Sequence, residues 1–215
     1  VGMAYLGEMY ENGLGGLARD ELKAVELYKK SVDKGCDVGM ECLGEMYEKG
    51  LGGLETDELK ALGLYGKSLD DGSTLGQRRM RNLLRIMCER GRSHWNQGEY
   101  TRAVGLFREI LKFERCGSAL TFLGRARKNG RGEFKRDDVK AVKLFKEATR
   151  KGDICGMVHL GYMYEQGRGG LPQDDIKAIE LYKRANGDDA FAKALLARMY
   201  KDGRGGLPKD GERAI

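Results

Sequence analysis

Apolar residues recur at helical spacing along the chain, and short glycine-rich stretches interrupt them. Met40, Leu43 and Tyr47 fall on one stripe of a helix, with Gly44 on the same segment. The sequence GLGGL follows, and its glycines can supply the positive φ angles of a tight turn. A second amphipathic segment, DELKALGLY, then begins with an acidic residue. The pattern predicts two helices joined by a glycine turn.

The same pattern is repeated along the whole chain. A Lys-Ala or Arg-Ala step near the start of each second helix recurs every 36 to 42 residues. A small residue in the first helix precedes the alanine of this step by 17 residues in most copies and by 12 in the third. These small residues are Gly7, Gly44, Gly91, Gly124, Gly161 and Ala197. Repetition with this period predicts a structural array rather than a duplicated catalytic loop.

Each repeated feature has a role in helix packing. The small residues allow two helix backbones to approach closely, and an aromatic residue four positions after each marker alanine fills the gap to the next unit. The aromatic residues are Tyr28, Tyr65, Phe107, Phe145 and Tyr182. An aspartate four positions before the marker alanine is expected to cap the second helix. These aspartates are Asp20, Asp57, Asp137, Asp174 and Asp210.

One helix pair cannot bury its apolar stripe alone, whereas stacked pairs can. We therefore predict an all-α fold, a right-handed αα-superhelix of about five to six helix-turn-helix repeats. We expect one solenoid over residues 1–215 that is cut at both ends, because VGMAYLGEMY opens and KDGERAI stops inside a repeat. The predicted units are 1–35, 36–72, an irregular third unit 73–116, then 117–152, 153–187 and an incomplete 188–215.

The pattern LGxMYExGxGGLxxDxxKAxxLYxxA resembles the Sel-1-like repeat, a branch of the tetratricopeptide-type solenoids. The resemblance covers residues 3–34, 40–71, 120–151, 157–187 and, for its first half, 195–215. Residues 84–116 look instead like a tetratricopeptide repeat, through Gly91, His94, Gly98, Tyr100, Ala103 and Phe107. The resemblance implies an adaptor that assembles protein complexes.

Composition excludes several classes of protein. Hydrophobic residues make up 40% and charged residues 33% of the chain, and no run approaches the roughly 18–20 apolar residues of a membrane helix. We therefore expect no membrane insertion. The five cysteines, odd in number and irregularly spaced, argue against a disulfide framework or a zinc site and favour a reducing, cytoplasmic location. No metal or other cofactor is expected.

Two features of the sequence could suggest an enzyme, and each has a simpler structural explanation. The glycine turns resemble phosphate-binding loops, but GLGGLARD places an acidic residue where a phosphate would bind. Cys155 lies close to His159 in the sequence, which could suggest a nucleophile and its base. A partly buried helical histidine explains His159 more simply, since no third orienting group is evident. We predict that this segment is not an enzyme.

Charge is distributed unevenly along the chain. Residues 1–75 hold 8 basic and 15 acidic side chains, whereas residues 76–151 hold 21 and 8, a net charge of +13. In a solenoid of this type the first helices line the concave surface, so we predict a groove that is acidic at first and basic in its centre. The predicted partner-binding residues are Glu8, Glu45, Glu48, Arg85, Arg92, Trp95, Asn96, Arg125, Lys128 and Asn129. The alternative is that these charges form a solvated face and that Trp95 packs under the irregular third unit.

The sequence leaves the partner open. A protein or peptide, with an acidic segment or a carboxylate for the arginines, is the first hypothesis. Nucleic acid bound through residues 78–150 is the alternative, although apolar side chains interleave the arginines there and stacking aromatics are few. A third interpretation is a regulatory segment of a larger enzyme. The oligomeric state is not indicated by the sequence.

Overall fold

The computed structural model describes residues 1–70, 72–185 and 189–209. Over these residues all regular structure is helical, as predicted, and no strand occurs. The elements are α1 (Gly2–Asn12), α2 (Glu21–Val32), α3 (Asp37–Lys49), α4 (Glu58–Asp70), α5 (Thr74–Asn96), α6 (Tyr100–Phe113), α7 (Gly117–Asn129), α8 (Asp138–Arg150), α9 (Ile154–Glu165), α10 (Asp175–Ala185), α11 (Ala190–Asp202) and the short 3-10 helix η1 (Arg204–Gly206).

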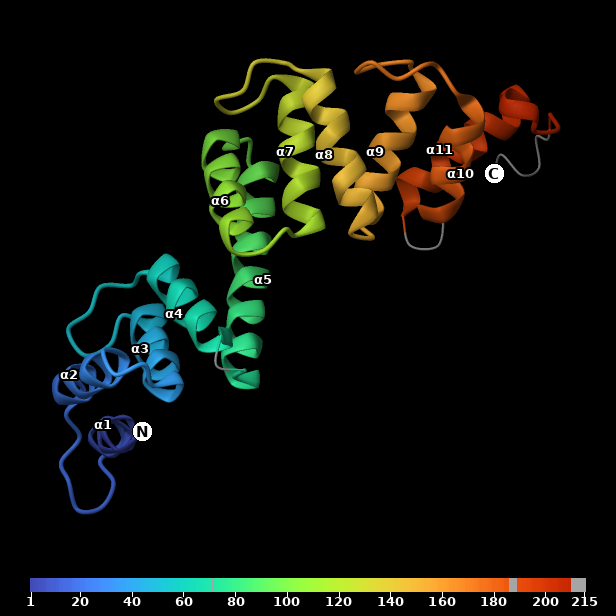
Figure 1. Ribbon diagram of the computed structural model, residues 1–215. Coiled ribbons are helices and arrows are strands. Elements are labelled where there is room, and N and C mark those ends of the chain that lie inside the picture. The colour runs from blue at the N-terminus through green and yellow to red at the C-terminus, as the bar shows by residue number, and fades with distance from the viewer. Residues whose placement is uncertain (71, 186–188, 210–215) are drawn as a thin grey trace. The chain divides into compact units, whose positions relative to one another are not determined.

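The chain forms two compact units, Val1–Met87 and Cys88–Ile215, and the boundary falls within α5. In the first unit α1 pairs with α2 and α3 with α4 (Figure 1). In the second unit α7 pairs with α8 and α9 with α10, and each pair packs on the next. The helix-pair repeat is therefore confirmed within each unit. The joining of all pairs into one solenoid over 1–215 stays a prediction.

The turn between paired helices is closed by hydrogen bonds that span it. After α3, Gly50 has a φ of 67°, in the left-handed region that favours glycine. The N–H of Asp57 then donates to the carbonyl of Tyr47 at 2.9 Å, which fixes the far end of the turn. The carboxylate of Asp57 accepts from the N–H of Lys60 at 3.0 Å and so caps α4. The same cap is present at Asp20, Asp137 and Asp174, as predicted; Asp210 lies outside the described residues.

In five helix pairs a glycine of the first helix lies directly against an aromatic ring of the second. A Cβ atom built on Gly44 would lie 2.6 Å from Cε1 of Tyr65, closer than real Cβ contacts. The other four pairs repeat this contact at Gly7–Tyr28, Gly91–Phe107, Gly124–Phe145 and Gly161–Tyr182. The third helix pair, α5 and α6, therefore has the same glycine–aromatic contact as the others, although the loop between its helices is shorter. The five small residues in these pairs are glycines because any side chain would displace the ring.

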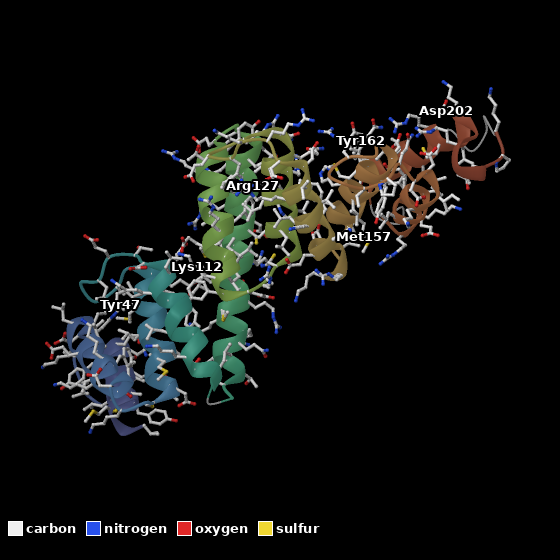
Figure 2. The ribbon with its side chains drawn as sticks, turned by 45° about the horizontal axis from the view of Figure 1, so that its top comes forward. Tyr47, Lys112, Arg127, Met157, Tyr162 and Asp202 are labelled. Atoms are coloured by element: carbon white, nitrogen blue, oxygen red, sulfur yellow. The ribbon has the colours of Figure 1, made fainter. Side chains whose placement is uncertain are left out.

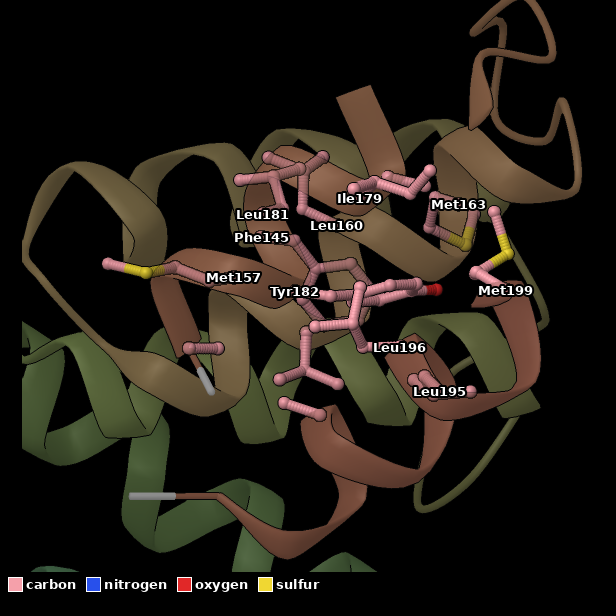
Figure 3. Close-up of a cluster of buried hydrophobic side chains, with 14 of the residues drawn as sticks. Phe145, Met157, Leu160, Met163, Ile179, Leu181, Tyr182, Leu195, Leu196 and Met199 are labelled. Atoms are coloured by element: carbon pink, nitrogen blue, oxygen red, sulfur yellow. The ribbon is translucent and has the colours of Figure 1, made fainter. Parts of the chain in front are cut away.

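The aromatic rings also contact the next helix pair along the chain. Tyr28, Tyr65, Phe107, Phe145 and Tyr182 all have 0% exposure. Tyr28 of α2 lies in one cluster with Leu43 and Met46 of α3. Tyr182 lies in a larger cluster that draws side chains from α8, α9, α10 and α11 (Figure 3). The predicted packing of the rings against the next repeat is confirmed for Tyr28, Phe145 and Tyr182, and each of the five rings also covers the glycine of its own helix pair.

Candidate anion-binding face

Helix α7 carries three cations that lie over aromatic rings: Arg125, Lys128 and, over Phe134, Arg127. Arg125 follows Gly124, the residue that contacts Phe145, so its side chain leaves the helix about 100° around the axis from that contact. Its guanidinium lies 4.8 Å from the Trp95 ring centroid and 5.0 Å from that of Phe122. Cation–π contacts of this kind restrain a guanidinium that would otherwise move freely in water.

The Trp95 ring lies under the guanidinium groups of Arg125 and Arg131, 4.8 and 5.7 Å from its centroid. Trp95 is one of the predicted partner-binding residues, but its side chain is only 3% exposed, which agrees with the alternative that it packs inside the fold. It packs edge-to-face against Tyr100 and Phe122, with ring centroids 4.9 and 5.4 Å away. Because these rings belong to α6 and α7, the burial of Trp95 results from the assembly of two helix pairs rather than from α5 alone.

Lys128 occupies a position that is acidic in three other helices. Glu11, Glu48 and Glu165 stand four residues after their glycines, and each accepts a hydrogen bond from the tyrosine hydroxyl of the paired helix, at 2.6, 2.7 and 2.9 Å respectively. In the α7–α8 pair the aromatic residue is Phe145, which has no hydroxyl, and the acid is replaced by Lys128. Both members of the hydrogen bond are therefore absent, and the ammonium lies 5.1 Å from the Tyr162 ring centroid instead.

Arg131, in the turn after α7, differs from its counterparts in later repeats. Arg168 and Arg204 stand at the same position after their small residues, and each forms a forked ion pair with the first-turn aspartate of the preceding repeat. Arg168 contacts Asp138 at 2.9 and 3.1 Å. Arg204 contacts Asp175 at 2.6 and 3.1 Å. For Arg131 that preceding position is Tyr100, and the guanidinium lies 4.4 Å from its ring centroid.

Arg92, Arg125, Lys128 and Arg131 are together called the basic face. Within the described part of the chain, Arg125, Lys128 and Arg131 form no ion pair with a carboxylate. Burial lowers the pKa of Lys128, and the charges of Arg168 and Arg125 lower it further. Burial likewise lowers the pKa of Arg125, with a smaller contribution from Arg131. These cations are partly desolvated and repel one another, so an anion among them would be favoured.

His159 of α9 lies beside the basic face. Its ring stacks on Phe145 with centroids 5.2 Å apart. Burial lowers the pKa of His159 to about 3, and the charges of Lys128 and Arg125 act in the same direction. The imidazole is therefore neutral at physiological pH and adds no charge to the face.

The remaining predicted basic-groove residues are distributed over both units. Arg92 donates to Oγ of Ser118 at 3.1 Å, and Asn96 and Asn129 are exposed at the ends of α5 and α7. Arg85 belongs to the first unit. Binding of a partner stays a prediction for each of these residues.

The acidic residues predicted in the first unit are mostly engaged within the chain. Glu45 forms ion pairs with Lys49 at 2.5 Å and Arg79 at 2.6 Å, and Glu48 accepts from the Tyr65 hydroxyl. Glu8 is exposed on α1. Because Glu45 and Glu48 are bound by side chains of the chain itself, fewer carboxylates are available to a partner than the sequence suggests. The basic face differs in this respect.

Sequence reasoning missed Arg131 and the supporting rings Tyr100 and Tyr162. Arg131 lies in the turn after α7, outside the helical stripe that holds the predicted residues. Comparison of Arg131 with Arg168 and Arg204 could have identified it, because only Arg131 has a tyrosine in place of the aspartate of the preceding repeat. Tyr162 lies on α9 (Figure 2), and α9 contacts α7 directly.

The Cys155–His159 pair lacks the features of a nucleophile and its base. Desolvation raises the pKa of Cys155, and the carboxylates of Asp153 and Asp189 act in the same direction, which disfavours the thiolate.

No described helix is long and apolar enough to cross a membrane. Over residues 1–70, 72–185 and 189–209, no three potential metal ligands among His, Cys, Asp and Glu side chains come together.

Comparisons with known proteins identify the class to which this helix-pair array belongs. The family model described as Sel1 repeat matches residues 1–36, 42–73, 117–153, 156–186 and 190–215, and passes over the third unit. The chain belongs to the Sel1 repeat family. Proteins of this family generally act as scaffolds for protein–protein interaction, and the fold is typical of non-catalytic scaffolds. No curated protein matches the sequence.

Two solved structures share the fold. A Sel1 repeat protein from Oxalobacter formigenes is 23% identical, with a TM-score of 0.52 over 99% of this chain and 80% of that one. A protective antigen of uropathogenic Escherichia coli, described as displaying an SLR fold, is 24% identical with a TM-score of 0.53. The alignment covers 99% of this chain and 43% of the antigen, so this chain spans under half of its length.

Proposed function

We propose that the chain is an interaction scaffold whose basic face binds an acidic segment of a partner protein. The observation that carries the proposal is the state of Arg125, Lys128 and Arg131, which are held on aromatic rings and form no ion pair with a carboxylate within the described residues. Similar arginines elsewhere in the second unit already have acidic partners, as Arg168 and Arg204 do.

The side chains of the face suit carboxylates. A guanidinium presents paired N–H donors that match the two oxygens of a carboxylate, and partial desolvation strengthens such bonds. Lys128 adds a point charge, and the exposed amide of Asn129 can bond a peptide backbone. An acidic peptide lying along α5, α7 and α9 would neutralise the repulsion that lowers the pKa of Lys128.

Nucleic acid is the second candidate, on the strength of the net charge of +13 in residues 76–151. Proteins that bind single strands usually stack bases on open aromatic rings. Trp95 is buried beneath Arg125 and Arg131, so its ring offers no open surface to a base. This difference favours a protein partner.

Affinity capture with matched variants tests the proposal. The bait would be the chain itself, an Arg125→Gln/Lys128→Gln variant, and a Lys143→Gln/Lys146→Gln control that loses the same charge from exposed positions on α8. Lysates would be treated with nuclease or left untreated. Each captured protein would be challenged with a synthetic peptide that copies its most acidic segment.

A protein that is captured by the native chain and the control, lost with the face variant and displaced by its own acidic peptide supports the proposal. Capture that disappears after nuclease treatment assigns the face to nucleic acid. Equal capture by all three baits contradicts the proposal, because the binding surface then lies elsewhere.

A further inference from the structure

Two free thiols meet at the joint between the third and fourth helix pairs. Cys88 is a buried residue of α5, and Cys116 is the N-cap residue of α7. Their Sγ atoms are 3.7 Å apart, at the contact distance of two sulfur atoms. Both residues lie in the second unit, so the contact does not depend on the placement of the first.

The residues that correspond to Cys88 in two other repeats form hydrogen bonds to the following repeat. Cys88 stands three residues before its glycine, as Glu41 and Thr121 do before theirs. Glu41 accepts from the N–H of Gly76 at 3.0 Å, and Thr121 donates to Asp153, the N-cap of α9, at 2.7 Å. Each link ties a first helix to the start of the next first helix. At the third joint the pair of cysteines takes this place.

The surroundings make the two thiols unequal. The hydrogen bond from Cys88 lowers the pKa of Cys116, and the backbone N–H groups of Ala119 and Ser118 at the start of α7 also lower it, while burial opposes them. The same hydrogen bond, with burial, raises the pKa of Cys88. Cys116 is also the less buried of the two. It is therefore the sulfur that a small oxidant meets as a thiolate.

We propose that Cys88 and Cys116 are a redox modification site, which a hydroperoxide converts to a disulfide that staples the third helix pair to the fourth. The Cys116 thiolate attacks the peroxide and takes up one oxygen, which gives a sulfenic acid, and the other oxygen leaves as water after protonation. The Cys88 sulfur then attacks the sulfenic sulfur, the S–S bond forms, and the hydroxyl leaves as water. Two thiols and one hydrogen peroxide thus yield one disulfide and two waters.

The proposal is tested by treating the folded chain with hydrogen peroxide, alkylating the remaining thiols and mapping the peptides without reduction. We expect one cross-linked peptide pair containing Cys88 and Cys116, a mass lower by the two hydrogens lost, and full recovery of both thiols with dithiothreitol. The disulfide should also raise the melting temperature by several degrees, because it closes a loop in the unfolded chain.

Variants separate the roles of the two sulfurs. In Cys88→Ser the sulfenic acid at Cys116 should persist and react with dimedone, whereas Cys116→Ser should give neither adduct nor cross-link. Cys155→Ser, which removes an exposed thiol, should leave the cross-link unchanged. Mapping of the native chain needs no variant to fold, so it decides the question alone. Peroxide treatment that leaves both residues reduced, or carries Cys116 to sulfinic acid without a cross-link, overturns the proposal.

Discussion

The hydroxyl of Tyr182 donates to Oε2 of Glu165 at 2.9 Å inside the core of the second unit. The Glu165 side chain is 1% exposed and also forms ion pairs with Arg198 at 2.6 Å and Arg204 at 2.8 Å. The carboxylate thus connects α9, α10, α11 and η1. Its counterpart Glu48 binds a tyrosine but is less buried.

Glu165→Ala should lower the free energy of unfolding by about 2–4 kcal/mol, because it leaves a buried hydroxyl and two arginines without their common acceptor. Glu48→Ala is the matched control and should cost about 1 kcal/mol, the usual contribution of one hydrogen bond. Chemical denaturation followed by circular dichroism measures both. Equal losses for the two variants would contradict the structural role of the Glu165 cluster.

Gly44→Ala should destabilise the first unit by about 1–3 kcal/mol, since the added methyl group would overlap the buried Tyr65 ring. Gly63→Ala on α4 is the control, because a Cβ atom there meets no atom within 4 Å. That change should instead stabilise the helix by about 0.5–1 kcal/mol. Denaturant titrations should therefore show changes of opposite sign in the free energy of unfolding for these two variants. A stabilising Gly44→Ala would show that the close approach of Gly44 to Tyr65 is not required.

Acid should destabilise the second unit through His159. Its folded pKa of about 3 lies below the ordinary value of 6.5, so between these values the unfolded chain binds a proton that the folded chain does not. Stability therefore falls as the pH drops through this window, by up to about 1.4 kcal/mol per pH unit. The difference in unfolding free energy between the native chain and His159→Gln, measured from pH 7 to 4, isolates this contribution. A difference that does not vary with pH would contradict a buried neutral imidazole.

Lys128→Gln offers an independent check on the cause of that shift. Removing the ammonium takes away one of the charges that lower the pKa of His159, so the imidazole pKa should rise. NMR titration of the His159 ring protons measures it directly. Lys146→Gln, an exposed cation on α8, should leave the value unchanged. The same pKa in all three proteins would mean that burial alone sets it.

Most of the fold could be predicted because repetition reveals which positions share a role. The aspartate caps at Asp57 and Asp174 and the Gly44–Tyr65 contact follow from residues that recur at fixed spacing. Within one repeat, local rules of helix capping and apolar periodicity suffice. Neither rule needs the relative placement of the units.

The candidate site was predictable only in part, because its cations, unpaired within the described part of the chain, result from residues that differ from their counterparts in the other repeats. Trp95 is buried by rings from α6 and α7, which no pattern within α5 indicates. Arg131 is left without a carboxylate because Tyr100 stands where later repeats carry aspartate. Glu45 looked free in sequence but is paired with Arg79, more than thirty residues away. Side chains from different repeats thus decide which charges remain available.

Direct titration of the basic face with an acidic peptide is the sharpest test of the proposed function. Fluorescence anisotropy would follow a labelled peptide of alternating Glu and Gly, with a Gln-for-Glu peptide and a single-stranded RNA as comparison probes. The proteins would be the native chain, Arg125→Gln/Lys128→Gln and the Lys143→Gln/Lys146→Gln control. We expect the native chain and the control to bind the acidic peptide alike and the face variant to bind it about tenfold more weakly or worse, since two charge-assisted contacts are lost. Equal affinity of the face variant and the control, or tighter binding of RNA than of the acidic peptide by the native chain, would contradict an acidic-segment scaffold.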